Sequence, residues 1–371
     1  MTKKLEKMKI YLKGSPAYYL AYDGEEKLIQ LLKDLNPDKV FLVEDNKVGE
    51  LTKDSLYLGI KRGFISKRIL FEASEENKTF ACLSDLCEAI IDAGVTKDSI
   101  IVAHGGGLIG NIAGLCAALI FRGIRFVEVP TTFLAQTDSV LSNKQAVNSS
   151  VGKNHIGVYY APQFIFADVK YLTVDKPERI KNGVVETMKN ALISDKQLFG
   201  ILKKMLRSDG KYTEEELYQI VKISVMSKMH ILEKDPSEKK YGMILEYGHT
   251  FGHAIEKLSS GKILHGEAVS IGMIVAGKIS LKLKIMSKAD YEEMVHFIRD
   301  CGGMNVKIPE DMTTEQIINA IHTDNKKNAR GICYVLLSGV GKIYNPNKNY
   351  MVTLKDSIVK EALDEYKTEV Q

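Results

Sequence analysis

Short apolar runs alternate with segments of helical periodicity through the first half of the chain. The runs are rich in β-branched residues and predict buried strands at residues 39–43, 99–103, 125–129 and 163–168. Between them, apolar residues recur at helical spacing over residues 83–93 and 110–122. This alternation is typical of an α/β domain with a mostly parallel, Rossmann-like sheet.

Helical patterns dominate the second half of the chain. Asp175 is placed to cap a helix that has Pro177 just inside it, and Thr213 with Glu216 forms a capping box before a long periodic segment. The 371 residues suffice for two cores. We therefore predict an α/β nucleotide-binding domain over residues 1–172 and an all-α domain that binds metal and substrate over residues 173–371.

Composition narrows the class of protein. A hydrophobic fraction of 45% and a charged fraction of 26% are those of a soluble globular protein. The net charge of +4 suits a small anionic substrate, but it is too weak and dispersed to predict nucleic-acid binding. The apolar runs are too short for a membrane span, and no signal peptide is expected. The five scattered cysteines predict reduced thiols in a cytoplasm.

A glycine-rich turn follows the second predicted strand, where residues 100–111 read IIVAHGGGLIGN. Gly105, Gly107 and Gly110 satisfy GxGxxG, a pattern that lets backbone N–H groups approach a pyrophosphate at a helix N-terminus. A tight strand-to-helix turn without a ligand is the alternative, since the usual motif follows the first strand. Glu128 lies at roughly the spacing of a ribose-binding acid. Asp45 is the better candidate for the nucleoside, although it could equally be a loop cap.

A cluster of histidines suggests a metal site. His249 and His253 share one helix face and His265 follows a short loop, so three of the eight histidines fall within 17 residues. A catalytic zinc-type site needs about three N and O ligands. Glu186, inside an otherwise apolar helix with Lys189 one turn later, is the natural carboxylate. The alternative is a structural or solvent-facing histidine pair.

Several lysines stand where apolar residues or plain loops are expected. Lys228 shares a helix face with Leu217 and Val221, so it either reaches solvent or points into a polar cleft. The others in suggestive contexts are Lys144, Lys153, Lys189 and Lys326. Together these lysines favour a site for an anionic substrate.

These segments together resemble the sugar-phosphate cyclase family, whose best-known member is 3-dehydroquinate synthase. The likeness runs from about residue 45 to residue 342. It is carried by Glu75-x-x-Lys78, HGGGLIGN, RGIRFVEVPTTFLAQTDS, SNKQAVN, GKNHIG, Glu186-x-x-Lys189, GHTFGHAIE, HGE and DNKK. The combination of PTT-x-LAQ-x-DS with GHT-x-GHA-x-E is the most specific part.

The resemblance implies a dehydroquinate synthase-like fold, NAD, and Zn²⁺ or Co²⁺. The implied metal ligands are Glu186, His249 and His265, with His253 a proton-transfer residue instead. The implied NAD-binding residues are Asp45, Glu75, Lys78, Gly105, Gly106, Gly107, Asn111, Thr131, Thr132, Asp138, Lys144 and Lys153. The implied substrate-site residues are Lys144, Lys153, Asn154, Lys189, Lys228, Glu246 and Lys326. Arg122 would reach the substrate phosphate, in a homodimer from the neighbouring subunit.

Departures from the dehydroquinate synthase pattern indicate the substrate. Gly242 replaces an arginine, Glu246 an asparagine and Asn111 an aspartate, and DSVLSNKQAVN replaces DSSVGGKTGVN. A glutamate would repel a substrate carboxylate and accept hydrogen bonds from sugar hydroxyls. These features resemble the branch that converts glucose 6-phosphate to 2-deoxy-scyllo-inosose and phosphate in aminoglycoside pathways. It does so by transient oxidation with NAD, phosphate elimination, re-reduction and intramolecular aldol closure.

Three alternatives remain. The first is dehydroquinate synthase activity itself, with the cyclases of seven-carbon sugar phosphates close to it. The second is a metal-dependent alcohol dehydrogenase of the glycerol dehydrogenase type, which would release NADH stoichiometrically. The third is a non-catalytic binding or scaffold protein, which would have no need of Glu186, His249 and His265 together.

Overall fold

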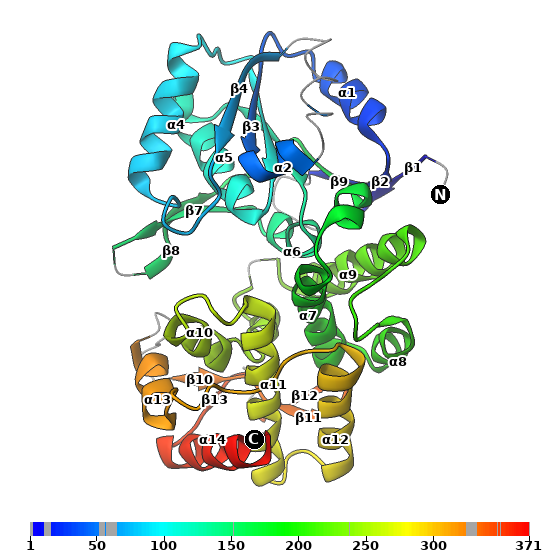
Figure 1. Cartoon of the computed structure of the whole chain (residues 1–371), viewed down its shortest axis with the longest axis vertical. Helices are drawn as coiled ribbons and strands as arrows, with labels where there is room; N and C mark the ends of the chain where they lie inside the picture. The colour runs from blue at the N-terminus through cyan, green and yellow to red at the C-terminus, as the bar shows by residue number, and fades with distance from the viewer. Residues whose placement is uncertain are drawn as a thin grey trace. The chain divides into compact units, whose positions relative to one another are not determined.

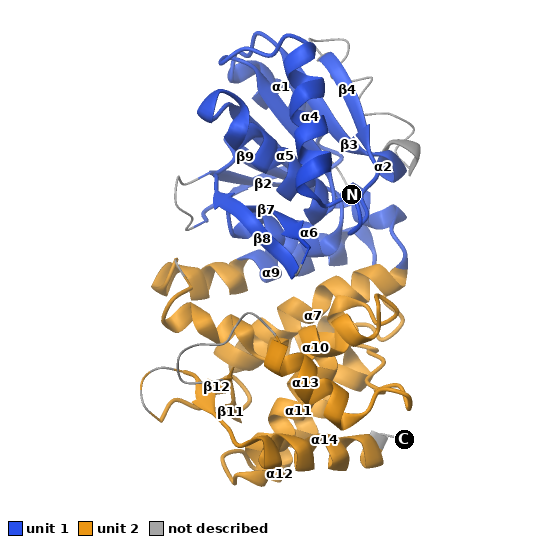
Figure 2. Ribbon diagram, turned by 90° about the vertical axis from the view of Figure 1, so that its left-hand side faces the viewer, with its two compact units in different colours: residues 1–176, 212–225 blue, residues 177–211, 226–371 orange. Residues whose placement is uncertain are grey.

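The computed structural model describes residues 3–10, 16–51, 56, 65–150, 152–236, 238–323, 332–346, 348 and 350–370. The chain divides into two compact units (Figure 2): unit 1 contains residues 1–176 and 212–225, and unit 2 contains residues 177–211 and 226–371. Residues 212–225 belong to unit 1, although their helical pattern predicts that they are part of the second domain. One of their contacts with the rest of unit 1 is an ion pair, in which Lys222 Nζ lies 2.7 Å from Glu6 Oε1.

Unit 1 is built on a twisted sheet (Figure 1). Among the described residues its strand order is β1-β2-β9-β6-β5-β3-β4, with β1 antiparallel to β2 and every other pair parallel. The strands are β1 (Lys4–Met8), β2 (Ala17–Tyr22), β3 (Val40–Asp45), β4 (Ile65–Phe71), β5 (Ile100–Gly105), β6 (Arg125–Pro130) and β9 (Phe164–Asp168). The mostly parallel sheet and its four predicted strands are confirmed.

Helices cover both faces of this sheet, and an antiparallel hairpin of β7 and β8 stands beside it (Figure 1). These elements are α1 (Glu25–Asp34), α2 (Asn46–Leu51), α4 (Phe80–Asp92), α5 (Gly107–Leu119), η1 (Ile120–Arg122), α6 (Phe133–Thr137), η2 (Ser139–Leu141), β7 (Lys144–Ser149), β8 (Gly152–Tyr159) and η3 (Val169–Val174). Helix α5 begins at Gly107, one turn before the predicted start at Gly110, because Gly110 N–H already donates to Gly106 O at 3.2 Å. The glycine run therefore provides the last residue of β5, the N-cap and the first residue of α5.

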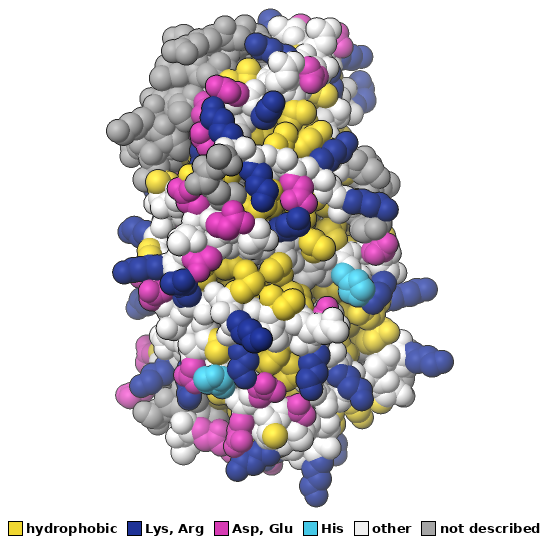
Figure 3. Space-filling view, turned by 90° about the vertical axis from the view of Figure 1, so that its right-hand side faces the viewer, with side chains coloured by type: hydrophobic (Ala, Val, Ile, Leu, Met, Phe, Trp, Pro, Cys, Tyr) yellow, Lys and Arg dark blue, Asp and Glu magenta, His cyan; other side chains and the backbone are white. Residues whose placement is uncertain are grey.

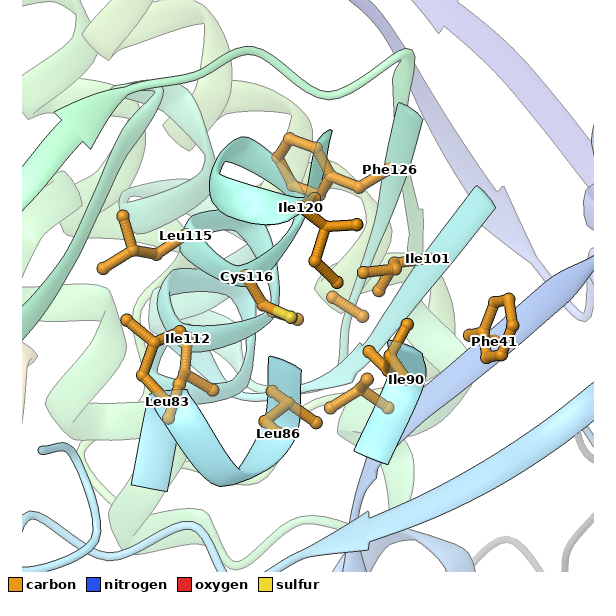
Figure 4. Close-up of a cluster of buried hydrophobic side chains, with 14 of the residues drawn as sticks. Phe41, Leu83, Leu86, Ile90, Ile101, Ile112, Leu115, Cys116, Ile120 and Phe126 are labelled. Atoms are coloured by element: carbon orange, nitrogen blue, oxygen red, sulfur yellow. The ribbon is translucent and has the colours of Figure 1, made fainter. Parts of the chain in front are cut away.

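The central strands β3, β5, β6 and β9 are buried on both faces, which explains their continuous apolar runs. On one face, Phe41, Ile101 and Phe126 pack under α4 and α5 (Figure 4). On the other, residues such as Leu42 and Val102 pack with Leu28 and Leu32 of α1. The sheet is thus the middle layer of three.

Unit 2 is mostly helical. Its elements are α7 (Pro177–Ser194), α8 (Lys196–Met205), η4 (Tyr241–Glu246), α10 (His249–Leu258), α11 (His265–Lys282), α12 (Lys288–His296), η5 (Phe297–Cys301), α13 (Thr314–Thr323) and α14 (Asp356–Val370). Helix α9 (Glu214–Lys234) starts in unit 1 and ends in unit 2. The predicted capping box at its start is confirmed, since Thr213 N donates to Glu216 Oε2 at 2.7 Å and Glu216 N to Thr213 Oγ1 at 3.3 Å.

The prediction that the second domain is all-α is wrong in detail. Unit 2 also contains two antiparallel pairs, β10 (Cys333–Tyr334) with β13 (Val352–Thr353) and β11 (Leu337–Gly339) with β12 (Lys342–Ile343). The segment is rich in aromatic and β-branched residues, which favour strands. Gly341 (φ 73°) supplies the left-handed residue of the tight β11–β12 turn.

The surface carries charges of both signs. In the face drawn in Figure 3, lysine and arginine side chains are interspersed with acidic ones and with small apolar areas. No helix in the described ranges is both long and apolar enough to cross a bilayer. All five cysteines are free thiols, and Cys87 Sγ lies 3.4 Å from Cys116 Sγ in unit 1.

Helices α10 and α11 approach each other at glycines. A Cβ atom added to Gly272 of α11 would lie 2.0 Å from Gly248 O, and one added to Gly252 of α10 would lie 3.0 Å from Val269 Cα. Gly248 itself has φ 79° and caps α10, so it favours glycine for backbone reasons as well. These contacts fix the distance between the helices that begin with His249 and His265.

We expect Gly272→Ala to destabilise the protein by about 1–3 kcal/mol or more, because its methyl group overlaps the backbone of α10. Thermal unfolding should shift down by roughly 5 °C. Gly200→Ala is the matched control, since it is also a helical glycine and a Cβ there meets nothing within 4 Å. That variant should be neutral or slightly more stable. Equal unfolding temperatures for both variants would contradict the packing argument.

Candidate metal and cofactor sites

Three helices of unit 2 bring Glu186, His249 and His265 together. The ligand atoms of the three side chains all lie within 4.8 Å of one another. Glu186 comes from the middle of α7, whereas each histidine is the first residue of its helix. Glu186 Oε1 is 3.4 Å from His249 Nε2 and 3.5 Å from His265 Nε2. Two imidazole nitrogens and one carboxylate oxygen are the donor set of a catalytic zinc-type site, so the residues fit the metal.

The outer nitrogens of both imidazoles are oriented by other groups. His249 Nδ1 lies 3.2 Å from Tyr247 O, and His265 Nδ1 lies 3.0 Å from Glu256 Oε2. A proton on each Nδ1 would therefore be held by an acceptor, which leaves the Nε2 lone pairs directed to the cluster. This outer support is typical of metal-binding histidines.

Burial and charge set the protonation of the three groups. Glu186 is buried, but Lys189 and the two histidines hold its pKa well below the usual value. Burial, followed by the nearby Lys189 ammonium, lowers the pKa of His249 to about 3. For His265 burial also opposes the charged form, yet hydrogen bonds to Glu186 and Glu256 outweigh it and raise the pKa to about 9. Without metal, one histidine is neutral and the other carries a proton.

Of the other predicted residues of unit 2, His253, Lys189 and Glu246 lie near this cluster. The ring of His253 lies 5.1 Å from that of His249 and 6.0 Å from that of His265, but His253 is not one of the clustered ligands. Lys189 is buried and donates to Glu186 Oε2 at 2.5 Å. Glu246 is close enough to influence the pKa of His249 electrostatically. Lys228 is also buried, so it does not simply extend into solvent.

In unit 1 the glycine turn is shaped by close packing. A Cβ on Gly105 would lie 2.6 Å from Ile109 Cγ1, and one on Gly107 would lie 2.8 Å from Ser139 Oγ. Gly106 is the N-cap of α5 and offers no side chain to the helix. A hollow there is lined by residues including Gly105, Gly106, Gly107, Gly110, Asn111 and Glu128. Backbone N–H groups at a helix start fit the pyrophosphate of a dinucleotide.

A polar cluster beside α5 joins several of the predicted NAD-binding residues. Lys78 Nζ donates to Asn111 Oδ1 at 2.8 Å and to Asn154 Oδ1 at 2.5 Å, and burial lowers the pKa of this lysine. Asn111 Nδ2 donates to Lys144 O at 3.0 Å, whereas the Lys144 side chain is exposed. Lys153 is exposed and close enough to Lys78 to affect its pKa.

The remaining predicted nucleotide residues lie near strand ends. Asp45 ends β3, and its side chain accepts a hydrogen bond from Lys47 N at 3.1 Å. This contact is the one expected of a loop cap, and nucleoside binding by Asp45 stays a prediction. Glu75 Oε2 accepts from Asn148 Nδ2 at 2.9 Å. Thr132 caps α6, while Thr131 Oγ1 is buried without a hydrogen-bond partner in the described part of the chain.

The predicted site residues that remain are Asp138, Arg122 and Lys326. Asp138 is half-buried just after α6. Arg122 is exposed, and its backbone has a left-handed conformation (φ 67°). It follows helix α5, which ends at Leu119 and not at residue 122 as predicted. Lys326 lies outside the described residues.

Sequence reasoning missed three supporting residues. Glu256 orients His265, and the signal for it was its place seven residues after His249 on the same helical face. Asn182 Oδ1 accepts from Gly266 N at 2.7 Å and so fixes the start of α11. Asn148 joins the Glu75 turn to β8 through Asn154 N, at 2.9 Å.

The chain matches two family models. Residues 68–182 match the 3-dehydroquinate synthase N-terminal family and residues 183–327 match the 3-dehydroquinate synthase C-terminal family. A sugar-phosphate cyclase of this kind is thus the class that fold and sites define, and the chain belongs to the 3-dehydroquinate synthase family.

Within the family, relatives of two activities are similar to this chain. A 2-deoxy-scyllo-inosose synthase from Niallia circulans is 39% identical over 80% of this chain and 81% of its own length. A 3-dehydroquinate synthase from Thermoanaerobacter sp. (strain X514) is 37% identical over 88% of this chain and 92% of its own. A crystal structure of 2-deoxy-scyllo-inosose synthase with carbaglucose-6-phosphate, NAD⁺ and Co²⁺ is 33% identical and superposes with a TM-score of 0.89, covering 98% of this chain and 99% of that one.

We expect the apparent affinity for Zn²⁺ or Co²⁺ to depend on pH through His265. Below about pH 9 this histidine carries a proton that the metal must displace. The affinity should therefore fall by about tenfold for each pH unit below that value. Competition with a chromophoric chelator between pH 6.5 and 8.5 measures it, and a flat profile would refute the assignment.

Glu256→Gln should weaken metal affinity by about 10–100-fold, because the amide is a poorer acceptor for the His265 Nδ1 proton. The fold should persist. Glu292→Gln is the matched control, since Glu292 is exposed on α12 and its ion pair with Lys288 Nζ, at 3.6 Å, lies at the surface. Metal content after dialysis distinguishes the two variants, and equal retention would show that Glu256 does not support the ligand.

Proposed function

We propose that this chain is a phosphate-eliminating lyase that converts D-glucose 6-phosphate to 2-deoxy-scyllo-inosose with NAD and a divalent metal. The observation that carries the proposal is Glu246, a half-buried carboxylate beside the Glu186–His249–His265 cluster. The relatives support the general activity. The negative charge of Glu246 favours a substrate that presents hydroxyl groups to it over one that presents a carboxylate.

The implied cofactors fit the two sites. Bound NAD would supply reversible oxidation of a ring hydroxyl, and Zn²⁺ or Co²⁺ would supply a Lewis acid, with no net redox change over the cycle. The glycine turn and Lys78 would hold the dinucleotide, and Glu186, His249 and His265 the metal. Lys228 and Lys189 would supply positive charge near the substrate, and His253 would move a proton.

The segment before Glu246 supports the choice of substrate. Asp235 Oδ2 accepts from Gly242 N at 2.9 Å, and a Cβ on Gly242 would lie 3.2 Å from Asp235 O and from Glu238 Cβ. The backbone is thus closely packed at Gly242, the position at which we expect an arginine in dehydroquinate synthases. A substrate carboxylate would meet Glu246 without that compensating cation, whereas a sugar hydroxyl would donate to it.

Dehydroquinate synthase activity is the alternative, because a synthase of that activity is similar to the chain at 37% identity. An alcohol dehydrogenase would differ from both by accumulating NADH.

We also propose a homodimer, supported by Leu119 and Phe121, which are 48% and 46% exposed beside Arg122. In a dimer these apolar side chains would be covered, and Arg122 would be placed against the partner subunit. The free thiols are consistent with our expectation of a cytoplasmic enzyme.

The decisive experiment compares glucose 6-phosphate with the seven-carbon dehydroquinate precursor, reading phosphate release and absorbance at the NADH band. We expect faster release from glucose 6-phosphate, many turnovers for each NAD, and no net absorbance change. Glu246→Gln should reduce that turnover by roughly tenfold to a hundredfold, since a charge-assisted hydrogen bond contributes about 1.5–3 kcal/mol. The variant should still bind metal, because Glu246 is not one of the clustered ligands, and its NAD affinity should stay unchanged. Faster turnover of the seven-carbon substrate would reverse the assignment.

A further inference from the structure

Glu128 is a carboxyl group inside an apolar layer. It is the fourth residue of β6 and is 4% exposed. In the parallel register it lies beside Ala103 of β5 and Ile165 of β9. Farther along the same face, apolar side chains such as Ile101 and Phe126 pack under α4 and α5 (Figure 4).

Two glycines of α5 make room for polar side chains on this face. A Cβ on Gly110 would lie 3.3 Å from Glu128 Oε1, and one on Gly114 would lie 2.6 Å from Gln145 Cδ. Gln145 Nε2 donates to Tyr160 O at 3.2 Å and lies 3.4 Å from Glu128 Oε1. A buried polar pair thus lies under the first two turns of the helix that the glycine turn begins.

The second oxygen of this carboxyl group is not satisfied within the chain. Glu128 Oε2 is buried and has no hydrogen-bond partner among the described residues. Glu128 also lines the hollow at the glycine turn, together with Gly105, Gly106 and Asn111. A buried polar atom that lines a ligand site and has no partner within the protein commonly forms a hydrogen bond with the ligand.

In the described part of the chain, no cationic side chain pairs with Glu128. The ionisable groups on the elements around it are Cys116 of α5, His104 of β5, Asp168 of β9, Lys144 of β7, and Asp138 beside α6. His104 contacts Glu44, Asp168 accepts from Gly24 N, and Cys116 contacts Cys87. Burial raises the pKa of Glu128 to about 8, so at neutral pH the group carries a proton.

We propose that Glu128 is a cofactor-binding residue that holds its proton and donates it, through Oε2, in a hydrogen bond to a phosphate oxygen of the dinucleotide at the glycine turn. This rests on the proposed use of NAD. An ionised carboxylate would repel the pyrophosphate, whereas the neutral acid complements it. The same proton removes the electrostatic penalty of placing this group in an apolar layer.

The test is the dissociation constant of NAD, measured by calorimetry with the metal-loaded protein from pH 6.5 to 9. For the wild type it should be constant to about pH 8 and then rise, approaching tenfold per pH unit as Glu128 ionises. Glu128→Gln keeps a neutral donor, so its affinity at pH 7 should match the wild type and lose this rise. Glu128→Met removes the donor and should weaken binding about tenfold or more at every pH.

Stability without NAD provides the second readout. The folded-state pKa of Glu128 lies above its ordinary value of 4.5, so folding must take up a proton as pH rises between 4.5 and about 8. Wild-type stability should fall over that range relative to Glu128→Gln and Glu128→Met. Glu128→Met should therefore be more stable at pH 8 yet bind NAD less tightly, a combination that a merely structural role does not give.

The outcomes separate the two proposals. If wild type does not bind NAD at any pH, the proposed function fails. If it binds NAD, but Glu128→Gln retains the rise above pH 8 or Glu128→Met binds as tightly as wild type, the role of Glu128 is wrong and the proposed function stands.

Discussion

A buried carboxylate must be compensated, and in unit 2 that requirement governs the arrangement of the helices around Glu186. One of its oxygens accepts from Lys189 on the same helix, and the other faces the Nε2 atoms of His249 and His265. Because the two histidines begin α10 and α11, the N-terminal ends of both helices lie at this carboxylate. The glycine contacts between those helices then allow the required close approach.

Unit 1 is under a different constraint, because its polar groups must come from a sheet whose central strands are buried on both faces. It does so at the carboxyl ends of its parallel strands, where Asp45 ends β3, the glycine turn begins at the end of β5 and Thr131 follows β6. Ligands in open α/β sheets bind at this edge. The hairpin of β7 and β8 adds Lys144 and Asn154, which the Lys78–Asn111 hydrogen bonds connect to α5.

The sequence predicted the features that have a strong local signal. The apolar runs located the strands, and the Thr213 capping box and Pro177 located helix starts. The clustered histidines and Glu186 were predicted to form a metal site, and the structure brings Glu186, His249 and His265 together. The short β10–β13 and β11–β12 pairs were missed because two- and three-residue strands have no detectable periodicity. Glu256, Asn182 and the Glu128–Gln145 pair were missed because their roles depend on contacts between distant elements.

The contrast between the helix pair and η4 bears on how such an enzyme can diversify. Gly272 and Gly248 constrain each other, so neither position can vary without moving the backbone that presents His249 and His265. The η4 segment is attached to Asp235 chiefly by backbone N–H groups, which any residue except proline provides. Substitutions can therefore accumulate at exposed or half-buried side chains of η4 while the chemistry of the cluster persists. A lineage could explore new substrates through this segment in small steps, without first losing its catalytic apparatus.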